Sequence, residues 1–187
     1  MKKKSDFVDT IKISLFSVAL IIFIRTFLFT PVTVEGASMM PTYQNGDRVI
    51  INKTATNLDM IERFDVIVFH PYEGQSERHI KRIIGMPGDQ VAYEDDTLYI
   101  NGKKFQEHYL NEFKSNLNDL GDFTYDFTLA ELTSVTTVPE GHYFVLGDNR
   151  RQSTDSRDPR VGFVSAEQII GESVFRIYPI SNIGTVE

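Results

Sequence analysis

The sequence predicts a mostly β domain, built from antiparallel sheets and preceded by one N-terminal transmembrane helix. Two observations support this fold class. One long apolar run lies near the N-terminus, and short segments rich in Val, Ile, Tyr and Phe follow it, separated by Gly, Pro, Asn and Asp. The 187 residues suffice for one sizeable domain. We therefore expect a cytoplasmic N-terminus (1–10), a membrane helix (11–30) and one extracytoplasmic domain (31–187).

The apolar segment "IKISLFSVALIIFIRTFLFTP" extends from Ile11 to Pro31. The 17 residues from Ile13 to Phe29 are near the short end of the length that spans a bilayer. Lys12 and Arg25 lie near the two ends, where their long stems carry the charges to the interface. We expect Pro31 to end the helix.

Two other interpretations of this segment are weaker. A buried helix of a soluble protein would have to be covered all round, because the segment has no polar face. A cleaved signal peptide has a similar charged start and apolar run, but a cut after Ala37 would place Glu35 where a small residue is required. We therefore favour a retained anchor, with the basic residues Lys2 to Lys4 in the cytoplasm.

Charge is distributed unevenly along the chain. Residues 1–30 carry five basic and two acidic residues, a net charge of +3, and the remainder carries a net charge of −10. An acidic body argues against a nucleic-acid partner, because phosphates require a basic face. The absence of cysteine excludes a disulfide framework, a thiol nucleophile and a cysteine-based metal site.

The β segments are identified by their composition and by the turn residues between them. In chain order they are VTVEGA (32–37), DRVIINK (47–53), FDVIVFH (64–70), RHIKRIIG (78–85), QVAYED (90–95), TLYING (97–102), HYFVLGD (142–148) and SVFRIYPI (173–180). Asn101-Gly102 predicts a type I′ hairpin turn. A short helix is expected in VSAEQII, with Ser165 as N-cap and Gln168 completing a capping box. We interpret residues 103–138, which are more polar, as an insertion of hairpins and loops within the same domain.

A candidate nucleophile, Ser38, lies in the stretch "TVEGASMMPTYQNGD" shortly after the apolar segment. A serine hydroxyl needs a neighbouring base to remove its proton, and histidine is the most familiar base. None of the four histidines lies in a stretch suited to that role. They are His70, His79, His108 and His142.

Lys81 is a sharper candidate for the base. It lies in "RHIKRIIGMPGD", between Ile80 and two further isoleucines. A lysine base must be neutral, and burial among apolar residues lowers a lysine pKa. The alternative is a basic pair on a solvated strand edge. Alternation along the strand does not decide between them, because isoleucines fall on both faces.

A third polar cluster is "GDNRRQSTDSRDPRVGFV", from Gly147 to Val164. Taken alone, it is compatible with a solvated loop. The alternative is a braced loop, in which Asp–Arg pairs fix a hydroxyl beside Lys81.

Taken together, these motifs resemble those of the bacterial type I signal peptidases (leader peptidase family), most closely the short Gram-positive form. The order and spacing of four motifs are far more specific than any one of them, and the likeness extends from the apolar segment to about Val164. The four motifs are SMMPT (38–42), GDRVIINK (46–53), KRIIGMPGD (81–89) and GDNRRQSTDSR (147–157).

The resemblance implies a role for each matching residue. Ser38 would be the nucleophile and Lys81 the general base, with Ser153 donating or accepting a hydrogen bond that orients the lysine amine. Two structural ion pairs would hold the loop, namely Asp148 with Arg82 and Asp155 with Arg157.

The resemblance also implies how substrate is bound. Met39 and Ile80 would line the pocket for the small residue before the scissile bond. Gly36 occupies the position at which Gram-negative members carry a serine that supports the oxyanion. Any oxyanion hole in this chain must then use backbone N–H groups, with that of Ser38 as the main donor.

The activity implied by the resemblance is removal of signal peptides from exported preproteins by a membrane-anchored serine endopeptidase. It would cut after a small residue, at Ala-x-Ala sites, and would need no metal and no other cofactor. The implied partners are preproteins and membrane lipid, and the secretion translocase is a further candidate. Two alternatives are a catalytically inactive homologue that assists surface-protein assembly and a self-cleaving Ser–Lys regulator. The latter would need a DNA-binding module in place of residues 1–30.

Overall fold

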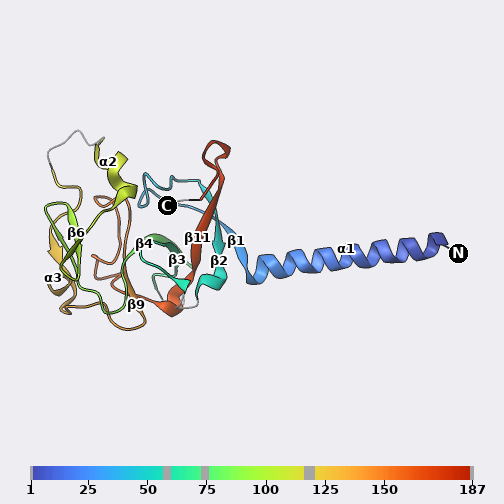
Figure 1. Cartoon of the computed structure of the whole chain (residues 1–187), viewed down its shortest axis with the longest axis horizontal. Coiled ribbons are helices and arrows are strands. Elements are labelled where there is room, and N and C mark those ends of the chain that lie inside the picture. Colours follow the sequence, from blue (N-terminus) through green and yellow to red (C-terminus); the bar gives the residue numbers. More distant parts are fainter. Residues whose placement is uncertain (1, 57–59, 73–75, 116–120, 186–187) are drawn as a thin grey trace.

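A computed structural model describes residues 2–56, 60–72, 76–115 and 121–185. A long N-terminal helix, α1 (Lys2–Phe27), projects from a domain of antiparallel β-sheets (Figure 1). The predicted fold class is thereby confirmed. The remaining helical elements are short and lie between strands.

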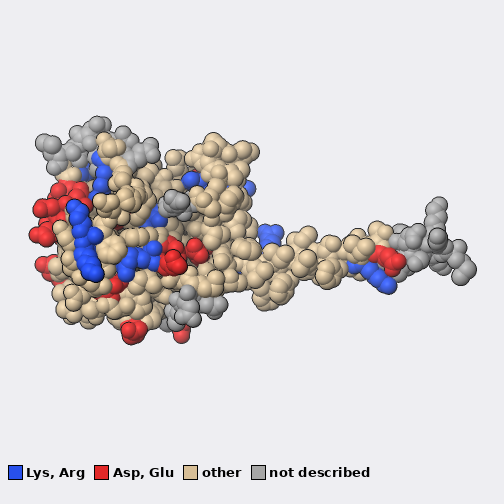
Figure 2. All heavy atoms as spheres, in the orientation of Figure 1, with Lys and Arg blue, Asp and Glu red and all other residues tan. Residues whose placement is uncertain are grey.

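The helix α1 contains a 20-residue stretch, Asp9–Leu28, with a mean hydropathy of 2.1 and no buried part. Figure 2 shows that its middle carries no charged side chain. Burial within the β domain is therefore wrong as an explanation of its apolar character, and the helix is compatible with a membrane anchor. The helix ends before Pro31, because residues 29–33 pair with the next strand instead. Proline is tolerated there because this strand forms a sheet edge.

The larger sheet has seven strands in the order β1-β2-β11-β3-β4-β9-β10. The bounds are β1 (Phe29–Thr33), β2 (Arg48–Asn52), β3 (Val66–Phe69), β4 (His79–Gly85), β9 (His142–Leu146), β10 (Val164–Ser165) and β11 (Ile169–Tyr178). The first predicted segment, VTVEGA, is thus strand only in part, because β1 begins at Phe29 and ends at Thr33. Central strands such as β4 are buried on both faces.

The smaller sheet has four strands in the order β7-β6-β5-β8 and lies at the end of the domain away from α1 (Figure 1). Its strands are β5 (Val91–Glu94), β6 (Thr97–Ile100), β7 (Lys103–Phe105) and β8 (Phe127–Thr128). The predicted hairpin turn is confirmed: Asn101 and Gly102 join β6 to β7 with φ angles of 53° and 72°.

The described part of residues 103–138 differs from the predicted hairpins and loops. It contains η3 (His108–Leu110), α2 (Asn111–Ser115) and α3 (Leu129–Thr133), besides β7 and β8. The helix α3 begins with a capping box formed by Thr128 and Glu131. Residues 116–120 lie outside the described part.

The short helix predicted near residues 164–170 is a single 3₁₀ turn, η4 (Ala166–Gln168), with the expected capping box of Ser165 and Gln168. It stops there because Ile169 already pairs with Phe69 in the sheet. Two further 3₁₀ turns are η1 (Lys53–Thr56) and η5 (Ile180–Asn182).

Three apolar clusters form the core. One packs the smaller sheet against β4 and β9, through residues such as Tyr93, Leu98 and Phe144. A second lies around Ile67 and Ile83. The third joins β2, β3 and β4 to the segment after β1, and includes Met39, Tyr43 and Ile80. The segment that carries Ser38 is therefore anchored on the same core as the strand that carries Lys81.

Candidate active site

Ser38 lies in the loop that joins β1 to β2. Backbone hydrogen bonds close the base of this loop, from Val34 N to Asp47 O (2.8 Å) and from Gly46 N to Val34 O (2.9 Å). Met39 and Tyr43 are buried beneath the loop. The loop is thus held at its base and from below, and Ser38 is left at the wall of a cleft.

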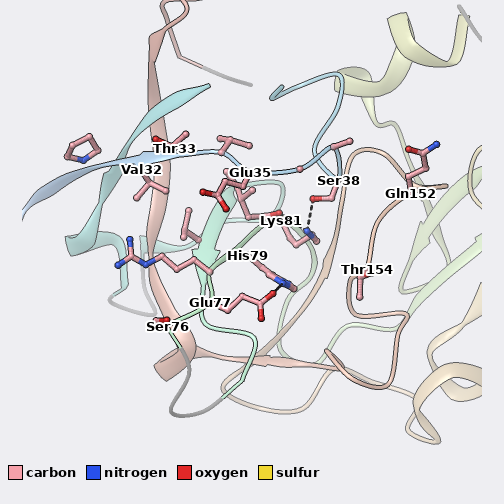
Figure 3. A pocket seen from close by; sticks show the side chains of 17 residues that line it. Val32, Thr33, Glu35, Ser38, Ser76, Glu77, His79, Lys81, Gln152 and Thr154 are labelled. Carbon is pink, nitrogen blue, oxygen red and sulfur yellow. Dashed lines mark hydrogen bonds and ion pairs between the residues drawn. The ribbon is translucent and has the colours of Figure 1, made fainter. Parts of the chain in front are cut away.

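Lys81 lies on β4, between β3 and β9, and is only 3% exposed. The alternative of a solvated strand edge is therefore wrong. The Lys81 Nζ atom lies 2.8 Å from Ser38 Oγ and 3.0 Å from the Ile80 carbonyl oxygen. In Figure 3 the amine and the hydroxyl point toward one another from two separate segments.

The environment of Lys81 favours the neutral amine. Burial lowers the pKa of Lys81 from 10.5 to about 8, although the carboxylates of Asp155 and Asp148 act in the opposite direction. A lysine with this pKa is partly neutral near pH 7 to 8, as a general base must be.

The loop after β9 carries the two ion pairs expected from the sequence, and both are buried. Asp148 receives hydrogen bonds from Arg82 Nε (2.9 Å) and Nη2 (2.7 Å) and also accepts from the Thr42 hydroxyl. Asp155 receives them from Arg157 Nε and Nη2, both at 2.8 Å. The pair of Asp148 with Arg82 holds the loop against β4, and Thr42 links it to the Ser38 loop. The pair of Asp155 with Arg157 braces the loop internally.

The hydrogen bonding of Ser153 differs from the expectation. Its Oγ atom is buried and has no hydrogen-bond partner within the described part of the chain. The predicted hydrogen bond to Lys81 is therefore not formed in this structure. Ser153 nevertheless lies against Gly147: a Cβ atom on Gly147 would be 2.1 Å from Ser153 Oγ and 2.4 Å from the Ser38 carbonyl oxygen. Only glycine allows this close approach.

The cleft beside Ser38 and Lys81 has a volume of about 650 Å³. It is lined mainly by the end of β1 and the segment after it, by the start of β4 and the residues before it, and by the loop after β9. Gly36 and Ile80 line it, as expected. Met39 does not: it is 1% exposed and belongs to the core beneath the loop. Met39 therefore differs from the expected lining residue, because its side chain packs inward.

A histidine lies at the cleft, but none of the four histidines forms a hydrogen bond with Ser38 in this structure. His79 lies in the cleft wall, and its Nε2 atom is 3.0 Å from Glu77 Oε1 (Figure 3). Burial lowers the pKa of His79 below its ordinary 6.5. Within the described residues, no group of three or more His, Cys, Asp or Glu side chains could hold a metal ion.

The backbone N–H groups of Gly36 and Ser38 differ in their hydrogen bonding. That of Gly36 already donates to Asn45 Oδ1 at 2.9 Å. That of Ser38 donates to no group in the part of the chain that the structure describes.

Sequence reasoning assigned no role to Asn149 or Thr42, and both contact the site. Asn149 donates from its backbone N–H to Ser38 O (3.0 Å) and from its side chain to Ala37 O (3.1 Å). Asn149 stands in the polar cluster that was singled out, directly after Asp148. Its position in this cluster indicated that Asn149 could lie near the site. Its partners, Ala37 and Ser38, are more than 100 residues away in the chain and could not be identified from the sequence.

Comparisons with known proteins agree with the resemblance. The family model described as "Signal peptidase, peptidase S26" matches residues 7–178. The chain is 48% identical over 163 residues to signal peptidase I of Bacillus caldolyticus, covering 87% of each chain. It is 39% identical over 183 residues to signal peptidase I T of Bacillus subtilis, covering 97% of this chain and 91% of the relative. A crystal structure of signal peptidase I from Enterococcus faecalis is similar with a TM-score of 0.54 and 49% identity, over 60% of this chain and 95% of that one.

Proposed function

The chain belongs to the signal peptidase I family of peptidase S26 hydrolases, and from this premise we propose that it removes signal peptides with a Ser38–Lys81 dyad. The family accounts for the substrates, which are preproteins with signal peptides. The observation that supports the dyad is the 2.8 Å separation between Lys81 Nζ and Ser38 Oγ at the wall of a cleft.

In the proposed acylation step, neutral Lys81 takes the proton of Ser38 as the hydroxyl oxygen attacks the scissile carbonyl carbon. The oxyanion that forms accepts a hydrogen bond from the free Ser38 N–H. When the C–N bond breaks, Lys81 transfers its proton to the leaving amine. Ser38 is left as an ester of the signal peptide.

In the deacylation step, Lys81 takes a proton from water, and the resulting hydroxide equivalent attacks the ester carbonyl. The ester bond breaks, Ser38 regains its proton and the signal peptide is released with a free carboxylate. The two ion pairs, Asp148 with Arg82 and Asp155 with Arg157, hold the loop around the dyad. Ser153 acts in this scheme as a packing neighbour of Gly147 and Ser38.

We expect the cleft to select small residues before the cut, at Ala-x-Ala sites. Gly36 and Ile80 line the cleft where the substrate backbone must approach Ser38. Helix α1 would anchor the enzyme, with residues 1–10 in the cytoplasm and residues 31–187 outside. Enzyme and signal helix then share one membrane, which raises their effective concentration. Membrane lipid is thus a further partner, and the translocase remains a candidate.

The test uses the full-length protein in detergent with a preprotein that carries an Ala-x-Ala site, and mass spectrometry locates the cut. We expect cleavage after the second alanine, and none with Ser38→Ala or Lys81→Ala. Full activity of Lys81→Ala would refute the dyad and direct attention to His79. If the wild type cuts nothing where a known signal peptidase cuts, the inactive-homologue alternative replaces the proposal.

A further inference from the structure

Asn149 forms hydrogen bonds with two backbone carbonyl groups next to the nucleophile, those of Ala37 and Ser38. Its side-chain amide donates to the carbonyl oxygen of Ala37 at 3.1 Å, and its backbone N–H donates to the carbonyl oxygen of Ser38 at 3.0 Å. Asn149 is 8% exposed, and it follows Asp148, which Arg82 and Thr42 hold in place. The loop after β9 thus presents Asn149 to the Ser38 loop from a fixed position.

The contact with Ala37 acts on the peptide group whose N–H belongs to Ser38. The Ala37 carbonyl and the Ser38 N–H lie in one planar trans unit and point in opposite directions. The Asn149 amide and the Met40 N–H, which donates to the same oxygen at 3.1 Å, together fix this carbonyl and therefore also the direction of the Ser38 N–H. This hydrogen bonding also polarises the unit, which makes the N–H a stronger donor.

The Ser38 N–H must supply a larger share of the oxyanion's hydrogen bonding in this chain than in an enzyme that also has a side-chain donor. Position 36 is glycine and has no hydroxyl to offer, and the Gly36 N–H is already bonded to Asn45. The Ser38 N–H has no partner among the described residues. A donor that is aimed in advance is worth more than one that must reorient during the reaction.

We propose that Asn149 is a positioning residue for peptide-bond cleavage, which aims the Ser38 N–H at the developing oxyanion by holding the Ala37–Ser38 peptide plane. This inference rests on the proposed function. It predicts an effect on the transition state with little effect on substrate binding. Misplacing one such donor lowers kcat by on the order of 10- to 100-fold.

The test compares Asn149→Asp and Asn149→Ala with wild type, as full-length protein in detergent acting on an Ala-x-Ala peptide. Both variants keep the backbone N–H bond to Ser38 and lose the side-chain donor to Ala37. Asn149→Asp also adds a carboxylate, whereas Asn149→Ala changes no charge. We expect kcat to fall about 10- to 100-fold with KM within about threefold of wild type. A peptide aldehyde, which forms a tetrahedral adduct with the serine, should lose affinity in parallel, whereas the cleaved product peptide should not.

A matched control is Asn52→Asp. The Asn52 side-chain oxygen only accepts hydrogen bonds, from Thr54 N (3.0 Å) and Thr54 Oγ1 (2.7 Å), and a carboxylate oxygen accepts them equally. Asn52 does not line the cleft. This variant should keep wild-type kcat and KM.

A merely structural role of Asn149 would give a different result. Collapse of the loop would move Asp148 and Asp155 relative to Lys81, so the pH at which activity is half-maximal would shift. With positioning alone, that pH stays at the wild-type value in Asn149→Ala while kcat falls at every pH. If Asn149→Asp does not fold, as judged by circular dichroism, the uncharged Asn149→Ala carries the test.

The proposal is overturned if kcat of a folded variant stays within twofold of wild type, or if the pH profile of the uncharged Asn149→Ala shifts. Failure of the proposed function is distinct, because then the wild type itself would cut nothing or Ser38→Ala would remain active.

Discussion

The Nζ atom of Lys81 lies 2.8 Å from the Oγ atom of Ser38, although the two residues are 43 positions apart. Ser38 comes from the loop between β1 and β2, and Lys81 comes from a central strand of the larger sheet. One apolar cluster, which includes Met39 and Ile80, connects the two. The residues next to each member of the pair are thus packed together, and this packing keeps the hydroxyl and the amine in contact.

The pH dependence of cleavage should follow the ionisation of Lys81. Burial lowers its pKa to about 8, and only the neutral amine accepts the serine proton. We therefore expect kcat/KM to rise about tenfold per pH unit below pH 8 and to level off above it. Initial rates between pH 6 and pH 10 on an Ala-x-Ala peptide measure this. A profile that is already level at pH 6.5 would contradict a lysine base and favour His79, whose pKa is lowered below 6.5.

Burial of the Lys81 amine should lower the free energy of unfolding. In the folded protein its pKa is lowered, so between about pH 8 and pH 10.5 the unfolded chain binds the proton and the folded chain does not. The free energy of unfolding consequently rises with pH across this window. Below pH 8 the burial penalty is fully present, and the difference between 10.5 and about 8 corresponds to about 3 kcal/mol.

Replacement Lys81→Met should therefore abolish cleavage and raise the melting temperature at pH 7, by about 6–12 °C. The gain should shrink as the pH approaches 10.5. Because the chain has no tryptophan, melting is best followed by circular dichroism. Lys103→Met, at an exposed position on β7, is the control and should show no comparable gain. A melting temperature of Lys81→Met at or below that of wild type would show that burial of the amine is not costly.

The fold class followed from composition and turn chemistry, but the faces of the strands did not. Strand β4 is buried on both faces, so alternation carries no information about the direction of Lys81. The helix α3 was missed although its capping box, Thr128 with Glu131, is visible in the sequence. The same signature correctly located the turn after Ser165. The polar character of residues 103–138 had hidden it.

The sequence predicted those residues of the candidate site that a local motif identifies, but not the long-range contacts between them. Ser38, Lys81 and the two ion pairs stand in motifs that resemble a known family. The side-chain contact of Asn149 with Ala37 joins residues 112 positions apart, and that of Tyr43 with Ser173 joins residues 130 apart. Such pairs depend on how the sheets fold together, which no local pattern specifies. For Ser153 the motif identified the residue but not its contacts. Its hydroxyl forms no hydrogen bond with any described residue.

Gly147 should not tolerate even one extra methyl group. A Cβ atom there would lie 2.1 Å from Ser153 Oγ and 2.4 Å from the backbone oxygen of Ser38. We expect Gly147→Ala to lower kcat/KM on the order of 100-fold and to destabilise the fold by about 1–3 kcal/mol. Peptide cleavage and thermal melting measure the two effects. Gly121→Ala is the control, because its nearest atom is the flexible end of Arg151 at 3.4 Å.

A second substitution separates the two clashes. The double variant Gly147→Ala/Ser153→Gly removes the contact with Ser153 but leaves that with the Ser38 backbone. Its melting temperature should recover in part while its activity stays low. Full recovery of activity would show that the Ser38 backbone does not depend on Gly147.

The 103–138 insertion should support the active-site loop through a buried ion pair. Arg150 binds Glu107, which also accepts hydrogen bonds from Tyr93 (2.8 Å) and Tyr109 (2.6 Å). Arg150 Nε also donates to the Gly147 carbonyl at 3.0 Å. Gly147 in turn lies against Ser153 and the Ser38 backbone. A change at Glu107 therefore reaches the site through one arginine.

Glu107→Gln should leave the Arg150 guanidinium buried without a countercharge, at a cost of about 3–5 kcal/mol. Burial alone would raise the pKa of Glu107, but Arg150 and the hydrogen bonds lower it overall. The stabilisation by this carboxylate is thus present above its ordinary pKa of 4.5 and is lost as the pH falls. We expect the melting temperature of Glu107→Gln to be well below that of wild type at pH 7, and the difference to narrow on acidification. Glu94→Gln, at an exposed position on β5, should match wild type. Equal melting temperatures for Glu107→Gln and wild type at pH 7 would mean that the insertion does not hold the loop through this pair.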